Sequence, residues 1–291
     1  MNELPVKVLR IDSRLRASGT SSDFSIVLPR ALTFPEDAVC YVSAVSVPFS
    51  WYNVSESMND VLFCIERKGA TVIQACRAIA LPKGQYTALS LPTMLQTSLN
   101  TGSTLTGMTY QVTYDSTRGT ISIRLVNGTG SDATARFQLP SETELMSVAW
   151  RSANWVALGG GTAATYDIRD PDSIGDLLRL PETSISTTSL ESGLVNVSPI
   201  DVLYLRCSLN NFSTLGCRGE ADWIARIPVD VSYGFTIHYE HSGLLDDHFG
   251  CGGQSGVQEL RFSLVNSKNT IVDLNGAPMS VELVFSHRQP G

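Results

Sequence analysis

The chain consists mainly of short apolar runs in which hydrophobic and polar residues alternate. In the run 234–240, Phe235, Ile237 and Tyr239 alternate with polar residues. A period of two places alternate side chains on opposite faces of a strand, so such runs predict antiparallel strands with one face on a core. Eight runs of strand character cover residues 6–12, 23–28, 38–47, 202–208, 222–229, 234–240, 258–265 and 280–286. Turn-forming residues separate them, which is typical of a β-sandwich or barrel.

The run 38–47 (AVCYVSAVSV) differs from the others because it is apolar on both predicted faces. One face would carry Val39, Tyr41, Val45 and Val47, and the other would carry Cys40, Val42 and Ala44. A strand that is covered on both sides lies inside a sandwich or against another subunit.

The number and order of the runs predict an all-β fold. Three strands before residue 50 and five after residue 200 make eight, which is the strand count of a jelly roll. We therefore expect a single eight-stranded antiparallel jelly roll with an α+β insertion between the third and fourth strands. Residues 1–50 and 196–291 would form the discontinuous jelly-roll domain, and residues 51–195 the inserted domain.

One amphipathic helix is predicted inside the insertion. Leu91, Leu95 and Leu99 recur at i, i+4 and i+8, with Ser90 as a candidate cap and Pro92 in the first turn. Strand-like runs at 61–67 and 71–81 precede the helix, and a hairpin at 110–115 and 120–126 follows it. A helix this short is marginal alone, so we expect it to pack on the apolar face of the hairpin. Residues 142–148 predict a second short helix, with Ser141 as its cap.

Composition and charge narrow the function classes. Hydrophobic residues make up 43% of the chain, charged residues 17%, and the net charge is -7. A low share of charge also suits a large assembly surface, because interfaces lose charge at their centres. No basic run exceeds two residues, so we expect no direct nucleic-acid contact. No apolar run approaches the roughly 18 residues of a membrane helix, and the start MNELPVKVLR has no signal-peptide core.

The histidine-rich segment HYEH (238–241), with DDH (246–248) after it, is the strongest metal-like motif. His238 and His241 are three residues apart, so in a continuing strand they would point to opposite faces. We therefore expect polar residues at a strand end and predict no metal. GxSxG is absent and the glycines at 158–161 lack a phosphate-loop context, so we predict no catalytic residue and no cofactor.

Large aromatic residues are the remaining candidates for a functional role. Trp51 and Tyr52 close the third predicted strand, and Trp223 begins the fifth. Such residues serve either as buried anchors within a chain or as anchors of a subunit interface. Both interpretations of Trp51 and Tyr52 stay open at the level of the sequence.

Several stretches together resemble the penton, or minor capsid, proteins of polinton/Maverick-type and virophage-type double-stranded DNA viruses. They are residues 11–54 (beginning IDSRLRASG), LPKGQYTALSLPTMLQTSLN, YQVTYDSTRGTISI, RGEADWIARIPVDVSYG (218–234) and DLNGAPMSVELVF (273–285). The least similar part is 130–200. The resemblance implies a structural protein of the virion without enzymatic activity, assembled inside the host cell.

The resemblance also implies partners. Five copies would form a homopentamer at each icosahedral vertex, amid trimers of a double-jelly-roll major capsid protein. Trp51, Tyr52 and Trp223 are then our candidates for the subunit interface. The insertion would face outward, where it could bind a host receptor or anchor a spike.

Two other interpretations share the predicted fold. The first is a receptor- or carbohydrate-binding spike or fibre head, which would use loop aromatics as ligand platforms. The second is a jelly-roll enzyme, either a metal oxygenase or a glycosidase, which would need the HYEH segment to converge on the sandwich interior.

Overall fold

The chain folds into two compact units, each built around antiparallel sheets, and strands make up most of the regular structure. The terminal unit comprises Met1–Trp51 and Ile200–Gly291, and the inserted unit comprises Tyr52–Pro199. The computed structural model describes residues 7–56, 59–68, 72–101, 108–127, 134–147, 149–150, 152, 173–181, 183–185, 187–209, 222–241 and 248–287.

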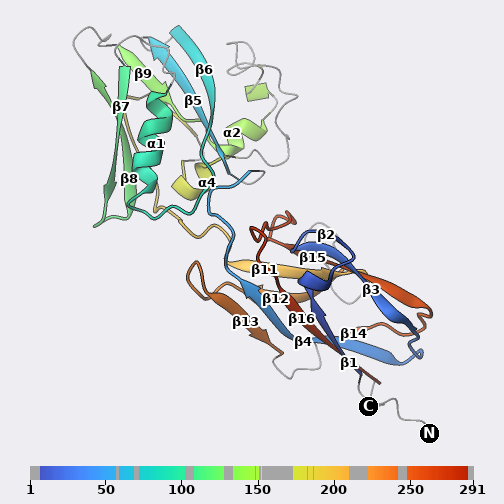
Figure 1. Cartoon of the computed structure of the whole chain (residues 1–291). Coiled ribbons are helices and arrows are strands. Elements are labelled where there is room, and N and C mark those ends of the chain that lie inside the picture. The colour runs from blue at the N-terminus through green and yellow to red at the C-terminus, as the bar shows by residue number, and fades with distance from the viewer. Residues whose placement is uncertain are drawn as a thin grey trace. The chain divides into compact units, whose positions relative to one another are not determined.

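The part of the terminal unit that the structure describes contains two five-stranded sheets (Figure 1). The first has the order β1 (Lys7–Asp12), β16 (Ser280–His287), β4 (Ala38–Pro48) and β13 (Thr236–Glu240), with β14 (Phe249–Gly250) paired to β4. The second has the order β12 (Trp223–Pro228), β11 (Val202–Cys207), β15 (Val257–Val265), β3 (Asp23–Leu32) and β2 (Ser18–Gly19). A 3-10 turn, η1 (Ser13–Leu15), connects β1 to β2. Each of the eight runs predicted as strands overlaps one of these strands.

Strand β4 contains a bulge that its sequence does not reveal. Its pairing with β16 skips Ser43, which lies between two paired residues. The buried residues of β4 are Ala38, Cys40, Val42, Val45 and Val47. The extra residue turns the later side chains over, so residues of even number before the bulge share the core face with residues of odd number after it. The expectation that Val39 and Tyr41 lie on the same face as Val45 and Val47 is therefore wrong.

Over its described residues, the inserted unit contains two three-stranded sheets and short helices (Figure 1). One sheet has the order β10 (Ser189–Glu191), β8 (Thr120–Asn127) and β7 (Met108–Asp115), and the other has the order β6 (Val72–Ala80), β5 (Val61–Lys68) and β9 (Ala135–Gln138). The helices that the described residues define with both ends are α1 (Leu91–Asn100), α2 (Glu142–Met146) and α4 (Gly175–Leu178).

Helix α1 packs on the hairpin of β7 and β8, as its leucine spacing predicts. Leu91, Leu95 and Leu99 are all 0% exposed and share one core cluster with residues of both strands. The helix also covers the open edge of β7. The Asn100 side chain donates to the Tyr110 carbonyl oxygen at 2.9 Å and accepts from the Tyr110 amide at 2.7 Å, and Gln96 accepts from the Val112 amide at 2.9 Å. An edge strand needs such cover because its backbone groups would otherwise be open to pairing with another chain.

The two predicted caps have different outcomes. Ser141 caps α2 as predicted: its hydroxyl accepts from the Glu144 amide at 3.1 Å, and Glu144 accepts from the Ser141 amide at 2.9 Å. The prediction that Ser90 caps α1 is wrong, because its side chain makes no hydrogen bond to the start of the helix. Ser90 instead closes a turn with Thr87, whose amide donates to the Ser90 hydroxyl at 2.9 Å.

Candidate functional site

The outer face of the second sheet of the terminal unit gathers aromatic and charged side chains. Along β11, Leu203, Leu205 and Cys207 are buried, so the alternation turns Tyr204 and Arg206 outward. Along β15, Leu260, Phe262 and Leu264 are buried, so Arg261 and Ser263 also face outward. We call the surface formed by Asp23, Tyr204, Arg206, Asp222, Trp223, Arg261 and Ser263 the outer patch.

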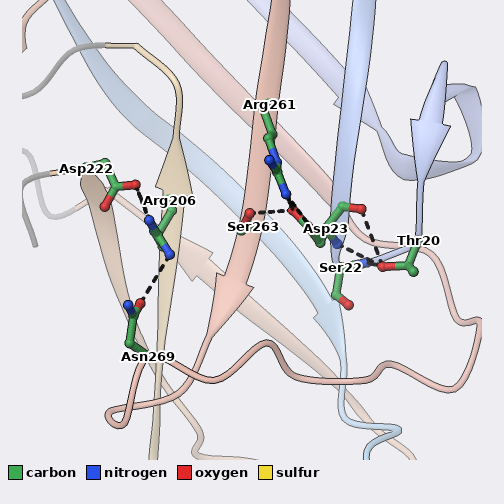
Figure 2. Close-up of polar contacts among 8 residues, drawn as sticks. All are labelled: Thr20, Ser22, Asp23, Arg206, Asp222, Arg261, Ser263 and Asn269. Carbon is green, nitrogen blue, oxygen red and sulfur yellow. Dashed lines mark hydrogen bonds and ion pairs between the residues drawn. The ribbon is translucent and has the colours of Figure 1, made fainter.

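Asp23 of β3 is the best-connected residue of the outer patch (Figure 2). Its carboxylate accepts from Arg261 at 2.8 and 3.1 Å and from the Ser263 hydroxyl at 2.6 Å. The Arg261 hydrogen bond is the largest cause that holds the pKa of Asp23 below its ordinary value, and the Ser263 hydrogen bond and the charge of Arg206 act in the same direction. Asp23 is therefore ionised at neutral pH.

Arg206 forms a second polar cluster beside that of Asp23, toward β12 (Figure 2). Its guanidinium lies 2.6 Å from the Asp222 carboxylate and donates to the Asn269 side-chain oxygen at 3.3 Å. Arg206 pairs with Ser263, and Ser263 pairs with Asp23, so the three residues form one row across the sheet. The ion pairs of Arg206 with Asp222 and of Arg261 with Asp23 therefore lie at the two ends of this row.

An aromatic pair borders the polar row. The rings of Tyr204 and Trp223 stack with centroids 4.1 Å apart and planes 23° apart. Both residues are half-buried. Trp223 lies on the edge strand β12 and pairs in register with Arg206 of β11. Tryptophan, tyrosine and arginine are the residue types that most often dominate the energy of protein interfaces. The outer patch thus has the composition of a protein contact surface.

The three aromatic residues proposed from the sequence have different surroundings in the structure. Trp51 is 3% exposed and stacks on Phe49 at 4.2 Å, so it packs within its own chain. Tyr52 is half-buried and is the first residue of the inserted unit. Trp223 lies in the outer patch. Of the three, Trp223 is the one whose partners form a candidate contact surface.

Sequence reasoning missed most of the outer patch. Tyr204 and Arg206 are the outward residues of the run VLYLRCS, and Arg261 and Ser263 are the polar alternates of LRFSL. The period of two places each pair on an outer face, but it does not say which strands are neighbours. Asp23, more than 200 residues before Arg261 and Ser263 in the chain, joins this surface through tertiary pairing alone.

The histidine-rich segment forms an aromatic cluster on β4. His241 and His248 each lie with ring centroids 4.6 Å from that of Tyr41, and His238 is exposed with its Nδ1 3.2 Å from the Ser46 hydroxyl. In the described part of the chain, no group of three or more His, Cys, Asp or Glu side chains is arranged to hold a metal ion. Asp246 and Asp247 lie outside the described residues, as do the glycines at 158–161.

Buried thiols are unsuited to nucleophilic chemistry. Burial raises the pKa of Cys207 to about 12 and that of Cys64 to about 12. A thiol is nucleophilic as its thiolate, so both groups are unreactive at neutral pH.

Of the helices in the described residues, none combines the length and the apolar character that a membrane crossing needs.

Comparison with known proteins places the fold. No protein-family model matches the chain, and no curated protein matches its sequence. Among solved structures, the crystal structure of the mavirus penton protein matches with a TM-score of 0.51 at 8% sequence identity. The match covers 98% of this chain and 100% of the penton chain. At this identity the likeness is one of fold: the chain has a penton-like fold over nearly its whole length.

Proposed function

We propose that this protein is a structural capsid protein that forms the vertices of an icosahedral double-stranded DNA virus. The observation that carries the proposal is the fold match to the mavirus penton protein, which extends over both chains nearly completely. The resemblance of residues 11–54, 218–234 and 273–285 to pentons of the polinton and virophage type agrees with it. The proposal includes no enzymatic activity, metal or cofactor.

Strand pairing supports the more specific proposal that the terminal unit is a single jelly roll. Numbered along the chain, the eight main strands are β1, β3, β4, β11, β12, β13, β15 and β16. They pair as first with eighth, second with seventh, third with sixth and fourth with fifth. This is the pairing of one long antiparallel hairpin folded over on itself, which makes the two sheets of a jelly roll. The inserted unit would then be the α+β insertion between the third and fourth strands.

The assembly follows from the proposed role. Five copies would close a ring at each vertex and contact the surrounding trimers of major capsid protein in the virion. The outer patch, with Trp223 as its aromatic anchor, is our candidate for one of these contacts, because it joins aromatic and arginine side chains on the outer face of the sheet. The inserted unit would face outward and serve a host receptor or a spike.

The solution mass of the purified protein, measured by light scattering with negative-stain images of the same sample, tests the proposal. We expect five times the subunit mass of 31.5 kDa and rings with fivefold symmetry. A stable trimer would favour a receptor- or carbohydrate-binding spike head instead. A mass of one subunit at the highest concentration reached, with or without the major capsid protein, would contradict the vertex role.

A further inference from the structure

Two exposed apolar features lie at the same end of the first sheet of the terminal unit, on its opposite edges. The sheet order places β1 at one edge and β13 at the other (Figure 1). The register aligns the two edges: Asp12 pairs with Ser280, Ser280 with Ser46, and Ser46 with His238. The segment after Asp12 and the segment before His238 therefore extend beyond the same end of the sheet.

The first feature is a rigid turn that exposes a leucine, which we call the leucine turn (residues 12–16). Leu15 is 81% exposed. The backbone beneath it is fixed, because the Ser13 amide donates to the Met279 carbonyl at 2.9 Å and the Met279 amide donates to the Ser13 hydroxyl at 2.9 Å. Arg16 closes the turn by donating to the carbonyl oxygens of Ser13 at 2.8 Å and Gly19 at 3.1 Å.

The second feature is a clamped loop that exposes two aromatic rings, which we call the aromatic loop (residues 230–235). Phe235 is 66% exposed and Tyr233 is 41% exposed. The Phe49 amide donates to the Phe235 carbonyl at 2.8 Å, and the Gly234 amide donates to the Phe49 carbonyl at 2.9 Å. Gly234 has φ +89°, a conformation that favours glycine. Both features are thus ordered before any partner binds, which lowers the entropic cost of binding.

The charges on the two edges are complementary. Residues 10–16 contain Arg10, Arg14, Arg16 and one aspartate, a net charge of +2. Residues 229–240 contain Asp230 and Glu240 and no lysine or arginine, a net charge of -2 with histidine neutral. The register again aligns the charged residues: Arg10 and Glu240 lie in one row, through Glu282, which forms an ion pair with Arg10 at 2.8 Å, and Ala44. With Glu282 counted, the β1 edge keeps a net charge of +1. A copy placed beside this edge would therefore meet opposite charge at the same level of the sheet.

We infer that the leucine turn of one copy of this chain docks on the aromatic loop of the next copy. The contact is heterologous: the β1 edge of each subunit meets the β13 edge of its neighbour, with Leu15 seated against Tyr233 and Phe235. Heterologous contacts of this kind close rings when the rotation allows it. The inference rests on the proposed function and specifies the surfaces that would join its subunits.

Two single substitutions, Leu15→Asp and Phe235→Asp, test the inference by light scattering of the full chain. Each removes one side of the contact, and because anchors at such contacts typically carry 2 kcal/mol or more, each is expected to weaken association by at least about 30-fold. Leu89→Asp is the matched control, since Leu89 is 74% exposed in the inserted unit and should leave the ring intact. All three sites are exposed, so circular dichroism and melting temperature should remain near those of the wild type.

Mixing the two variants tests whether the leucine turn of one copy meets the aromatic loop of another copy. Leu15→Asp subunits keep an intact aromatic loop, and Phe235→Asp subunits keep an intact leucine turn, so an equimolar mixture should form one native contact and stop at dimers. A mixture that remains monomeric overturns the heterologous pairing. Rings that survive both single substitutions overturn the inference and leave the proposed function standing, whereas a wild type that never associates overturns both.

Discussion

Asp23 shows how tertiary pairing decides the chemistry of a single residue. In the sequence it is the first residue of a strand after a serine pair, and nothing near it is basic. In the fold it accepts hydrogen bonds from Arg261 and Ser263, which are more than 200 residues away. The resulting hydrogen bonds and charges stabilise its ionised form and lower its pKa.

The pKa of Asp23 predicts a pH dependence of stability. Because the pKa is lowered in the folded state, its contribution is fully present above the unfolded value near 3.9 and is lost as the pH falls through the folded value. Asp23→Asn should therefore lower the free energy of unfolding at pH 7 and have less effect as the pH falls below about 4. Urea unfolding at several pH values measures this. The exposed Asp201→Asn is the control, and an effect that does not change with pH would contradict the explanation.

Trp223 and Trp51 make a matched pair for separating assembly from folding. Trp223 is half-buried in the outer patch, whereas Trp51 is 3% exposed. We expect Trp223→Ala to weaken the oligomer by about 30-fold or more with a small change in melting temperature. We expect Trp51→Ala to destabilise the folded chain by about 3–5 kcal/mol. Light scattering and calorimetry on the same samples measure both effects, and equal loss of fold and assembly in Trp223→Ala would argue against an interface role.

At the scale of elements, helix α1 answers why a protein of strands contains a helix at this point. Its leucine face completes the core of the inserted unit, and its amide side chains Gln96 and Asn100 pair with the open edge of β7. The leucine spacing alone predicts the first role. The second depends on which strand is left at the edge, which the sequence pattern does not reveal.

The packing of α1 predicts a large effect of truncating its central leucine. Leu95 is 0% exposed in the core of the inserted unit, so Leu95→Ala should destabilise the unit by about 2–5 kcal/mol through lost burial and a residual cavity. Thr93→Ala, on the exposed side of the same helix, is the control and should change stability little. Chemical denaturation measures both, and equal effects would contradict the observed orientation of the helix.

At the scale of the whole molecule, the first and last residues of the inserted unit lie close together. The Asn53 side chain donates to the Tyr86 carbonyl at 2.7 Å and to the Val197 carbonyl at 2.9 Å. Asn53 is 3% exposed, so this buried amide holds the two ends of the unit together. Adjacent ends are a usual feature of domains that are inserted into others.

The closeness of these ends predicts that the units fold independently. A fragment of residues 52–199 should unfold cooperatively with its own core, and a chain in which a short glycine–serine linker replaces residues 52–199 should keep the sheets of the terminal unit. Circular dichroism and two-dimensional NMR of both proteins measure this. An Asn53→Ala form of the fragment should be less stable than the fragment itself, because it leaves buried carbonyl groups without their donor. If both proteins gave NMR spectra without the signal dispersion of a folded chain, independent folding would be contradicted.

The sequence by itself determined the class and position of most elements. The period of hydrophobic residues depends only on neighbours in the sequence, so it could predict the positions of the main strands of the terminal unit, the hairpin at 110–126 and helix α1. A cap inside one short segment, Ser141 with Glu144, was also predictable because both partners lie within a single turn.

Only the tertiary structure decided the features that depend on neighbours. The bulge at Ser43 reverses the faces of β4 without any change in its apolar pattern, because a bulge arises from pairing with β16. The outer patch, and the alignment of the leucine turn with the aromatic loop, likewise require strands far apart in the chain to lie side by side. The period of hydrophobic residues along a strand indicates the face on which a side chain lies, whereas strand order and register decide which residues it contacts.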